Sequence, residues 1–325
     1  MSDHLSNVWL IGAGPIARAH AYAARALGCQ PAVIGRSTRN AEEMRKDTGL
    51  TVAEGGLASW LSRNPEPCGA AIVACDIEST PDVTVALLNF GVRRILIEKP
   101  GGVDSAAIAS LSDAARASSA DVFVAYNRRF LASTARAREL IEEDGGVSSF
   151  SFEFTELSSV VEKTAHSSRV KANWFLANSS HVVDLAFFLC GRPAVMTSLA
   201  NGALPWHPAA RFAGSGQTAG GAVFHYGADW TSAGRWGVEI NTPKRRLVLR
   251  PLEQLKVQQA GSFEIEDVPL PDESEKGLKP GFLGQLKAFL GGDDRLLLDI
   301  HGLRDLAENE YRAIVAGRDY KARAP

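Results

Sequence analysis

The residues whose types and spacing have the clearest chemical meaning lie close to the N-terminus. Residues 12–17 read G-A-G-P-I-A, which fits the G-x-G-x-x-A pattern of a turn that binds a dinucleotide pyrophosphate. The first glycine permits a tight turn, the second lets the backbone approach a phosphate, and the alanine lets the next helix pack closely. Proline suits the first helical turn, whose other N–H groups face the anion. The expected contacts are Gly12, Gly14, Pro15, Ile16 and Ala17.

A second group of polar residues bears on the choice of cofactor. After the next apolar stretch the chain reads Arg36-Ser37-Thr38-Arg39, and no acid occurs between Gly14 and Glu42. An NAD site usually has Asp or Glu here to bind the ribose 2′-OH. Two guanidiniums and two hydroxyls suit a 2′-phosphate instead, which favours NADP. NAD stays open, because Ser37 could hold a 2′-OH and the arginines could be solvated.

Further candidates follow two other apolar stretches. Cys75 and Asp76 come after residues 70–74, and Glu98 and Lys99 come after residues 92–97. Ligands bind beyond the carboxyl ends of parallel strands, so we expect these side chains near the dinucleotide. A lysine there can polarise a carbonyl or bind a hydroxyl, and desolvation would lower its pKa. The alternative is a solvated surface lysine.

A third candidate group lies in the second half of the chain, in residues 173–189. Asn178 or Ser179 is expected to cap a helix that begins near His181. His181 and Asp184 then share one helix face, among apolar neighbours. A histidine beside a carboxylate at a helix start is a credible proton carrier, and the alternative is a hydrogen-bonded core histidine.

Three motifs, taken together, give a family resemblance. The Gly-rich turn, Glu98-Lys99-Pro100 and Tyr126-Asn127-Arg128-Arg129-Phe130 resemble, in order and spacing, the glucose–fructose oxidoreductase/inositol dehydrogenase (Gfo/Idh/MocA) family. The likeness covers most of the chain. It implies an NAD(P)-dependent oxidoreductase of sugars, cyclitols and related alcohols, with Lys99 beside the nicotinamide and a cis bond before Pro100. The candidate substrate contacts are Tyr126, Arg128, Asn178 and Asp184, and Asn127 is a candidate cofactor contact. Glu98 is either structural or helps to orient the nicotinamide end of the cofactor.

The sequence departs from the family pattern at one position. The resembled helix carries an Asp four residues before its His, but here that position is Ala177, with Asn178 and Ser180 nearby. Either Lys99 and His181 are sufficient, or the substrate differs from the common polyols.

Composition narrows the class of protein and its partners. The 325 residues are 45% hydrophobic and 22% charged, with a net charge of −2, so nothing indicates a nucleic-acid or anionic-membrane partner. No long apolar span or signal pattern occurs, and the four cysteines form no C-x-x-C. We therefore expect a cytoplasmic protein with reduced thiols and no metal ion.

The elements that must position these residues fall into two groups. Residues 1–125 alternate short apolar strands with helices, which predicts a Rossmann domain with a doubly wound parallel sheet that binds NAD(P). Residues 126–325 predict an α+β domain with a large, mostly antiparallel open sheet for substrate binding and oligomerisation. A homodimer or homotetramer through that sheet is expected. The expected strands there are 147–154, 195–199, 222–230, 236–240, 246–250 and 255–259, and the expected closing helices are 281–290 and 298–315.

The leading hypothesis from sequence is hydride transfer between nicotinamide and a secondary alcohol or ketone of a sugar. The polar residues Lys163, His166, Arg169 and Lys171 could bind the acidic group of a nucleotide-linked or acidic sugar, and the alternative is that they form a solvated loop. Two alternatives remain: redox-neutral, NAD-assisted elimination or glycoside cleavage, and a non-catalytic dinucleotide sensor. Ala177 supports the sensor, whereas Lys99 and His181 argue against it.

Overall fold

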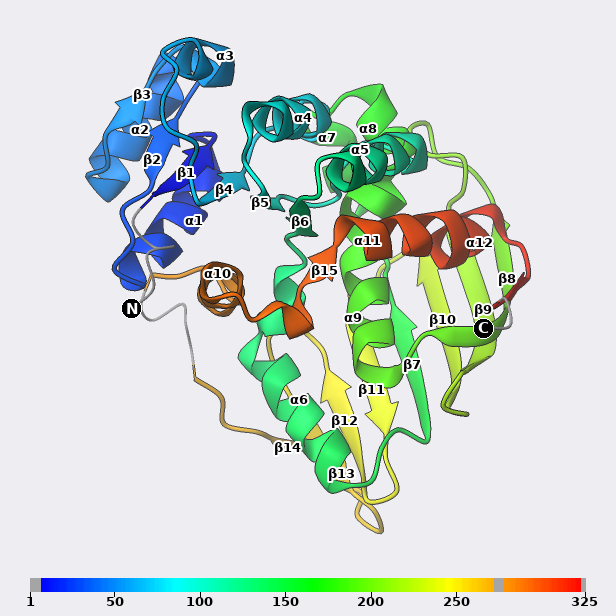
Figure 1. Ribbon diagram of the computed structural model, residues 1–325. Helices are drawn as coiled ribbons and strands as arrows, with labels where there is room; N and C mark the ends of the chain where they lie inside the picture. The colour runs from blue at the N-terminus through cyan, green and yellow to red at the C-terminus, as the bar shows by residue number, and fades with distance from the viewer. Residues whose placement is uncertain (1–6, 272–276, 323–325) are drawn as a thin grey trace. The chain divides into compact units, whose positions relative to one another are not determined.

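The computed structural model describes residues 7–271 and 277–322, which form two compact units, each built from two segments of the chain (Figure 1). The first unit contains residues 1–130 and 273–304, and the second contains residues 131–272 and 305–325. From sequence we expected two continuous domains, so the return of residues 273–304 to the first unit is a difference. The division falls within α11 (Ile300–Leu306).

The first unit is built on a seven-stranded sheet in the order β15-β6-β5-β4-β1-β2-β3, and six of these strands are parallel. Short apolar strands form its centre, because a sheet covered on both faces buries every side chain: β1 and β4 are buried at all four positions. This confirms the predicted Rossmann sheet. The strands are β1 (Val8–Ile11), β2 (Ala32–Ile34), β3 (Val52–Ala53), β4 (Ala70–Val73), β5 (Arg94–Ile97), β6 (Asp121–Val124) and the antiparallel edge strand β15 (Leu298–Asp299).

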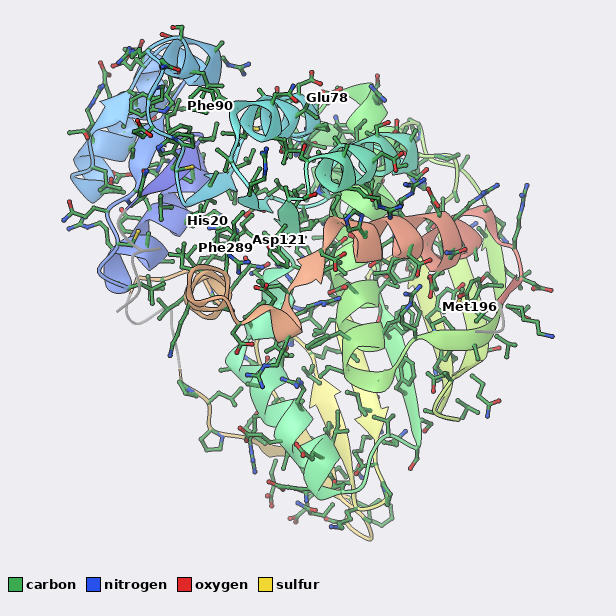
Figure 2. All side chains as sticks on the ribbon, in the orientation of Figure 1. His20, Glu78, Phe90, Asp121, Met196 and Phe289 are labelled. Atoms are coloured by element: carbon green, nitrogen blue, oxygen red, sulfur yellow. The ribbon has the colours of Figure 1, made fainter. Side chains whose placement is uncertain are left out.

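Helices connect these strands and cover the sheet. They are α1 (Pro15–Ala26), α2 (Thr38–Thr48), α3 (Gly56–Leu61), α4 (Thr80–Phe90), α5 (Ser105–Ala117) and α10 (Phe282–Gly291). The late helix α10 packs against α1, and Figure 2 marks one residue of each, Phe289 and His20. Phe289 is fully buried, and its carbonyl accepts hydrogen bonds from Arg94 of β5. Apolar packing and this cationic donor explain why a distant segment joins the first unit.

The second unit is built on a nine-stranded sheet in the order β14-β13-β12-β11-β7-β10-β9-β8-β16. All pairs are antiparallel except β7 with β10, so the predicted mostly antiparallel sheet is confirmed. The strands are β7 (Ser149–Glu153), β8 (Pro193–Asn201), β9 (Arg211–Thr218), β10 (Val223–Asp229), β11 (Gly237–Asn241), β12 (Arg245–Leu249), β13 (Lys256–Gln259), β14 (Glu266–Asp267) and β16 (Tyr320–Lys321).

Helices cover one face of this sheet. Helix α9 (Ser180–Cys190) packs on β7 and β11, and α6 (Ala132–Glu143) packs on α9 (Figure 1). The inward residues of the strands are aromatic: Phe152 stacks on Tyr226 with ring centroids 5.2 Å apart, and Phe187 of α9 meets it edge-on at 5.6 Å. Strand β7 alternates half-buried serine with buried phenylalanine, which is the period expected of a strand with one covered face. The remaining helical segments of this unit are α7 (Ser158–Lys163), α8 (Ser168–Ala172), a π-helical segment (Phe175–Ser179), a second π-helical segment (Ala307–Tyr311) and α12 (Arg312–Ala316).

Strand β9 is the longest of the strands that sequence reasoning missed. The other missed strands have two residues each (β3, β14, β15 and β16), and residues 298–299 of β15 were expected to begin the last helix. The β9 segment reads RFAGSGQT, and glycine disfavours strands. Packing explains the glycines, since a Cβ on Gly214 would collide with the ring of Tyr226, and one on Gly216 with the ring of Phe224. Tertiary packing of aromatic rings therefore overrides local propensity here.

Candidate active site

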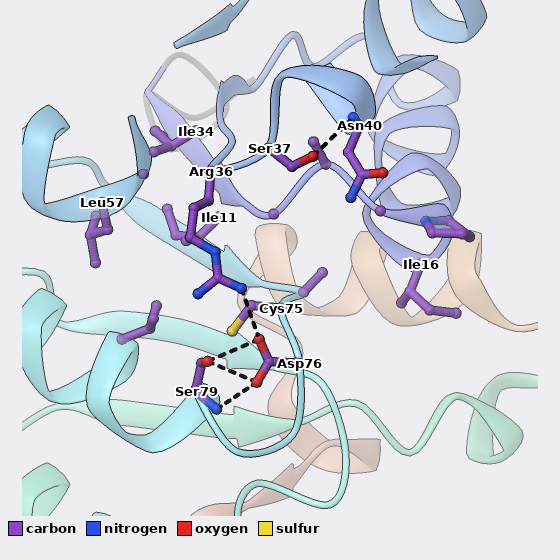
Figure 3. A pocket seen from close by; sticks show the side chains of 17 residues that line it. Ile11, Ile16, Ile34, Arg36, Ser37, Asn40, Leu57, Cys75, Asp76 and Ser79 are labelled. Atoms are coloured by element: carbon purple, nitrogen blue, oxygen red, sulfur yellow. Dashed lines mark hydrogen bonds and ion pairs between the residues drawn. The ribbon is translucent and has the colours of Figure 1, made fainter. Parts of the chain in front are cut away.

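A cavity of about 430 Å³ lies at the carboxyl ends of β1, β2 and β4 in the first unit (Figure 3). Its walls carry most of the predicted dinucleotide contacts, and its lining comprises Ile11, Gly12, Ala13, Gly14, Pro15, Ile16, Ile34, Arg36, Ser37, Asn40, Gly56, Leu57, Ala74, Cys75, Asp76, Ser79 and Val83. Ala17 lies beneath it, fully buried in α1, which fits its predicted role in close helix packing.

The two glycines of the turn have different geometry. Gly12 has φ +123°, and a Cβ there would collide with the backbone carbonyl of Ala74, so only glycine fits. Gly14 is the N-cap of α1, with Pro15 in the first turn, and nothing lies within 4 Å of a Cβ built on it. The open space beside Gly14, at the positive end of a twelve-residue helix, fits a pyrophosphate group.

At the end of β2, two of the four predicted cofactor residues line the cavity. The Arg36 guanidinium reaches across it to Asp76, with Nη2 and Oδ2 3.6 Å apart (Figure 3). Asp76 also accepts hydrogen bonds from the backbone N–H and the hydroxyl of Ser79. Burial alone would raise the pKa of Asp76, but the hydrogen bonds from Ser79 outweigh it and lower that pKa. The Ser37 hydroxyl caps α2 by accepting from the N–H of Asn40, 3.5 Å away.

The other two predicted residues of this loop face other partners. Arg39 pairs with Glu43 one turn along α2, and Thr38 donates a hydrogen bond to Glu54. Neither Arg39 nor Thr38 is among the described residues that line the cavity. Cys75 does line it, half-buried, with its Sγ 3.4 Å from the Thr80 hydroxyl, and burial raises the pKa of this thiol. All four cysteines are free thiols, as predicted.

The Glu98-Lys99-Pro100 segment follows β5, and the peptide bond before Pro100 is cis, as the resemblance implied. Glu98 lies against α1, where its Oε1 is 2.7 Å from Nε2 of the buried His20. His20 also packs on Phe282 of α10, with ring centroids 4.8 Å apart. Glu98 therefore ties the β5 end to two helices, while Lys99 is half-buried beside it.

The residues after β6 lie next to the same strand end. Tyr126 and Asn127 are buried, and Asn127 donates to the Pro280 carbonyl while accepting from Arg128. Nearby, burial lowers the pKa of Lys279, and the charge of Arg128 adds to that effect while Glu98 opposes it. Lys279 was not singled out from sequence, because nothing local relates it to residues about 150 positions earlier.

A second cavity of about 430 Å³ lies within the second unit. Apolar and aromatic side chains form most of its wall, and a few polar groups interrupt them. Its lining comprises Thr155, Glu156, Leu157, Val160, Val161, Thr164, Trp174, Asn178, Gly234, Arg235, Trp236, Pro251, Leu252 and Glu253. Such a composition is typical of a small-molecule site. Of the polar residues that suggested an acidic substrate, Lys171 donates to the Glu162 carbonyl and His166 packs on Trp174.

Asn178 lines this second cavity, but it does not cap α9. The π-helical segment Phe175–Ser179 continues directly into the helix, so the first N–H groups of α9 already have helical partners. Neither Asn178 nor Ser179 makes the predicted cap, and that prediction was wrong. Both side chains instead donate to Glu156: Asn178 Nδ2 to Oε1 and Oε2 at 3.2 and 3.1 Å, and Ser179 Oγ to Oε1 at 2.7 Å.

His181 and Asp184 lie on α9 and are 3% and 2% exposed. The His181 ring is 6.1 Å from that of Trp236, which lines the second cavity. His181 therefore lies beside a wall residue of the cavity. Trp230 is a core residue, and its indole N–H donates to the Phe154 carbonyl.

Sequence reasoning missed Glu156 entirely. It is a buried carboxylate at the end of β7, 22 residues before its partner Asn178. The available signal was an acid at a strand end, the same signal used for Asp76 and Glu98, but in an antiparallel sheet it has less meaning.

Comparison with protein families agrees with the first unit's geometry. Residues 6–126 match the model of the GFO_IDH_MocA oxidoreductase family, described as an NAD-binding Rossmann fold. No curated protein sequence matches the chain.

Solved structures share the whole fold at low sequence identity. Levoglucosan dehydrogenase in complex with NADH is 19% identical, with a TM-score of 0.76, covering 98% of this chain and 100% of that one. UDP-N-acetylglucosamine 3-dehydrogenase GnnA from Acidithiobacillus ferrooxidans is 16% identical, with a TM-score of 0.73, covering 96% and 97%. An oxidoreductase from Desulfitobacterium hafniense, described as a putative NADPH-dependent enzyme, is 15% identical, with a TM-score of 0.77, covering 98% of each chain. Among residues 7–271 and 277–322, no helix combines the length and apolar character needed to cross a bilayer.

Proposed function

The N-terminal domain of this chain belongs to the Gfo/Idh/MocA oxidoreductase family, and from that premise we propose that the chain transfers hydride between NAD(P) and a secondary alcohol or ketone of a sugar. The observation that carries the proposal is the cavity at the Gly12 turn, at the same edge of the sheet as Glu98 and Lys99. When bound there, the nicotinamide supplies the hydride donor or acceptor, and the protein supplies orientation and charge.

We assign cofactor binding, binding of the reacting oxygen and proton transfer to different residues. We assign the pyrophosphate to the α1 N-terminus and the Gly14 backbone. Lys99 binds the reacting oxygen and stabilises the charge that develops on it. His181 carries the proton, and Asp184 steadies it from the next turn of α9.

NADP is the favoured cofactor. Arg36 and Ser37 line the cavity at the start of α2, where a guanidinium, a hydroxyl and a helix N-terminus together suit a 2′-phosphate. The exposed Arg36 guanidinium is only 3.6 Å from Asp76, so binding a 2′-phosphate requires it to exchange one anion for another.

A sugar is the favoured substrate class. Structures of similar fold include levoglucosan dehydrogenase with NADH and levoglucosan, and a UDP-N-acetylglucosamine 3-dehydrogenase. The second cavity supports this choice, because it combines tryptophan rings with a carboxylate and an amide, which suit the C–H faces and hydroxyls of a sugar.

The direct test is cofactor reduction with a panel of sugars, for the wild type and Lys99→Met. We expect turnover with at least one sugar, and a loss of about a hundredfold or more in kcat for the variant. NADPH affinity, measured by nucleotide fluorescence, should stay within about twofold, because Lys99 acts on the reacting oxygen. An undiminished rate would reject the role of Lys99.

Product analysis separates the alternatives. A net oxidoreductase consumes one cofactor molecule for each sugar, whereas redox-neutral elimination changes the sugar with no net change in cofactor. If no sugar is changed and no cofactor is consumed, an enzymatic function is contradicted and a sensor is favoured.

A further inference from the structure

We propose that Glu156 is the substrate-binding carboxylate of the second cavity, replacing from the end of β7 the acid that position 177 lacks, and that it selects uncharged hydroxylated rings over anionic ones. This inference rests on the proposed sugar substrate. It follows from a buried carboxylate, oriented by two neighbouring donors, in the wall of a cavity lined with tryptophan.

The carboxylate is held in one orientation. Asn178 donates to both of its oxygens and the fully buried Ser179 hydroxyl donates to Oε1, while Glu156 itself is only 6% exposed. Burying a charge is costly unless it is hydrogen-bonded, and these donors offset that cost. A carboxylate has about four acceptor sites, so substrate hydroxyls can share its two oxygens with these donors.

The carboxylate of the cavity wall comes from outside the helix. Ala177 is 4% exposed within the π-helical segment and has no polar side chain. Its neighbour Asn178 lines the cavity instead, and it presents amide donors rather than an acid. Amide donors require an acceptor partner, and Glu156 supplies it.

The cavity walls fit an uncharged ring. Trp174 and Trp236 offer flat apolar faces, and the apolar side chains Val161 and Leu252 complete that part of the lining. The charged lining residues are Glu156, Glu253 and Arg235, two acids and one base. An anionic sugar therefore meets net repulsion, and its repulsion from the buried Glu156 is the least screened by solvent.

The test measures sugar binding by the full-length protein through its tryptophan fluorescence. The probes are levoglucosan, D-glucose and D-glucuronate, and the variants are Glu156→Gln and the control Glu266→Gln. Glu266 is an exposed carboxylate of β14, outside the lining of the cavity. We expect Glu156→Gln to weaken D-glucose binding about tenfold, the loss of one charge-assisted hydrogen bond, and Glu266→Gln to change it less than about twofold.

The discriminating readout is the ratio of D-glucose to D-glucuronate affinity. In the wild type it should favour D-glucose by about tenfold or more, and in Glu156→Gln it should fall towards one, because the repelling charge is gone. A merely structural Glu156 would leave the ratio unchanged, which would overturn the proposal.

A second variant, in which the acid and the amide exchange positions, keeps the test valid if Glu156→Gln lowers the melting temperature strongly. In Glu156→Gln combined with Asn178→Asp, the amide–carboxylate hydrogen bond is retained and the acid returns to the helix. We expect it to recover most of the lost affinity for D-glucose.

Two mixed outcomes separate this inference from the proposed function. If the protein turns over sugars but the wild type does not prefer an uncharged ring in binding, the role of Glu156 is overturned. The proposed hydride transfer is then unaffected. Selective binding that depends on Glu156, without turnover of any sugar, would support this inference and contradict the proposed hydride transfer.

Discussion

Arg36 is the residue to which we assign the proposed preference for NADP. Its guanidinium lines the cavity at the Gly12 turn and is 81% exposed, whereas Arg39, only three residues later, pairs with Glu43 along α2. Two arginines that looked equivalent in the sequence therefore have different surroundings. Of these two arginines only Arg36 lines the cavity, which supports its assignment to the proposed 2′-phosphate contact.

Replacing Arg36 tests this assignment. We expect Arg36→Ala to weaken NADPH binding by about tenfold, because one exposed charge-assisted contact is lost, with little effect on NADH. Titration of both nucleotides by fluorescence gives the comparison, and Arg39→Ala is the matched control. Equal losses for NADH and NADPH would contradict a 2′-phosphate contact.

At the scale of elements, the β1–α1 turn separates a folding requirement from a binding requirement. Gly12 needs a positive φ and has the Ala74 carbonyl against it, whereas Gly14 has open space around it. Glycine at position 12 is therefore required by the fold, whereas glycine at position 14 is required only by the proposed pyrophosphate contact.

Two alanine variants distinguish these roles. Gly12→Ala should destabilise the first unit by at least about 3 kcal/mol, from backbone strain and collision, and lower the melting temperature. Gly14→Ala should melt like the wild type but bind NADPH at least about tenfold more weakly, because its Cβ occupies the space of the pyrophosphate. Calorimetry and nucleotide titration measure the two effects, and a folded Gly12→Ala with normal binding would refute the geometric argument.

At the scale of the whole molecule, buried carboxylates make stability depend on pH. Asp144 of the second unit has no exposed side-chain surface and is paired with Arg245 at 2.7 Å. Burial would raise the pKa of Asp144, but hydrogen bonds from Thr242 and Arg245 outweigh it and lower that pKa. Glu153 behaves in the same way: burial is outweighed by hydrogen bonds from Arg250 and Thr155, so its pKa is lowered.

These shifts fix the sign of the pH dependence. The folded protein has lower pKa values at these carboxyls than the unfolded chain, whose values lie near 4, so the unfolded chain takes up protons first on acidification. Stability should be fully present above about pH 5 and fall as the pH drops through the lowered values. Melting temperatures from pH 7 to pH 2.5 check this, and Asp144→Asn should melt lower at pH 7 and show a shallower acid limb. An acid limb as steep as that of the wild type would contradict the role of Asp144.

The open face of the second unit's sheet bears on oligomerisation. Val195, Val223 and Leu199 are 42%, 54% and 67% exposed on β8 and β10, and the register places Gln217 between Val195 and Val223. We predict that Leu199→Asp combined with Val223→Asp shifts the protein towards monomer, because a charge on this row opposes its burial. Light scattering during gel filtration measures the mass, with Phe263→Ser, at a 99% exposed position, as the control. An unchanged mass would exclude this face as the interface.

The sequence by itself determined both sheet types and the local geometry of the Gly-rich turn, to which we assign the dinucleotide. Gly12, Gly14 and Pro15 act within a few residues of one another, and short-range sterics and a helix N-terminus give them the same meaning in any chain that places a strand before them. The alternation of apolar residues predicted most strands for the same local reason. The cavity-facing position of Arg36 also followed from its place after a parallel strand.

Only the tertiary structure decided which distant side chains meet. Asn178 and Ser179 had the composition of a helix cap, yet they bind Glu156, because an extra helical segment occupies the N–H groups they would have capped. Helix α10 joins the first unit because its aromatic residues pack on α1. Such pairings depend on the packing of side chains from separate elements, and that information is absent from any single stretch of sequence.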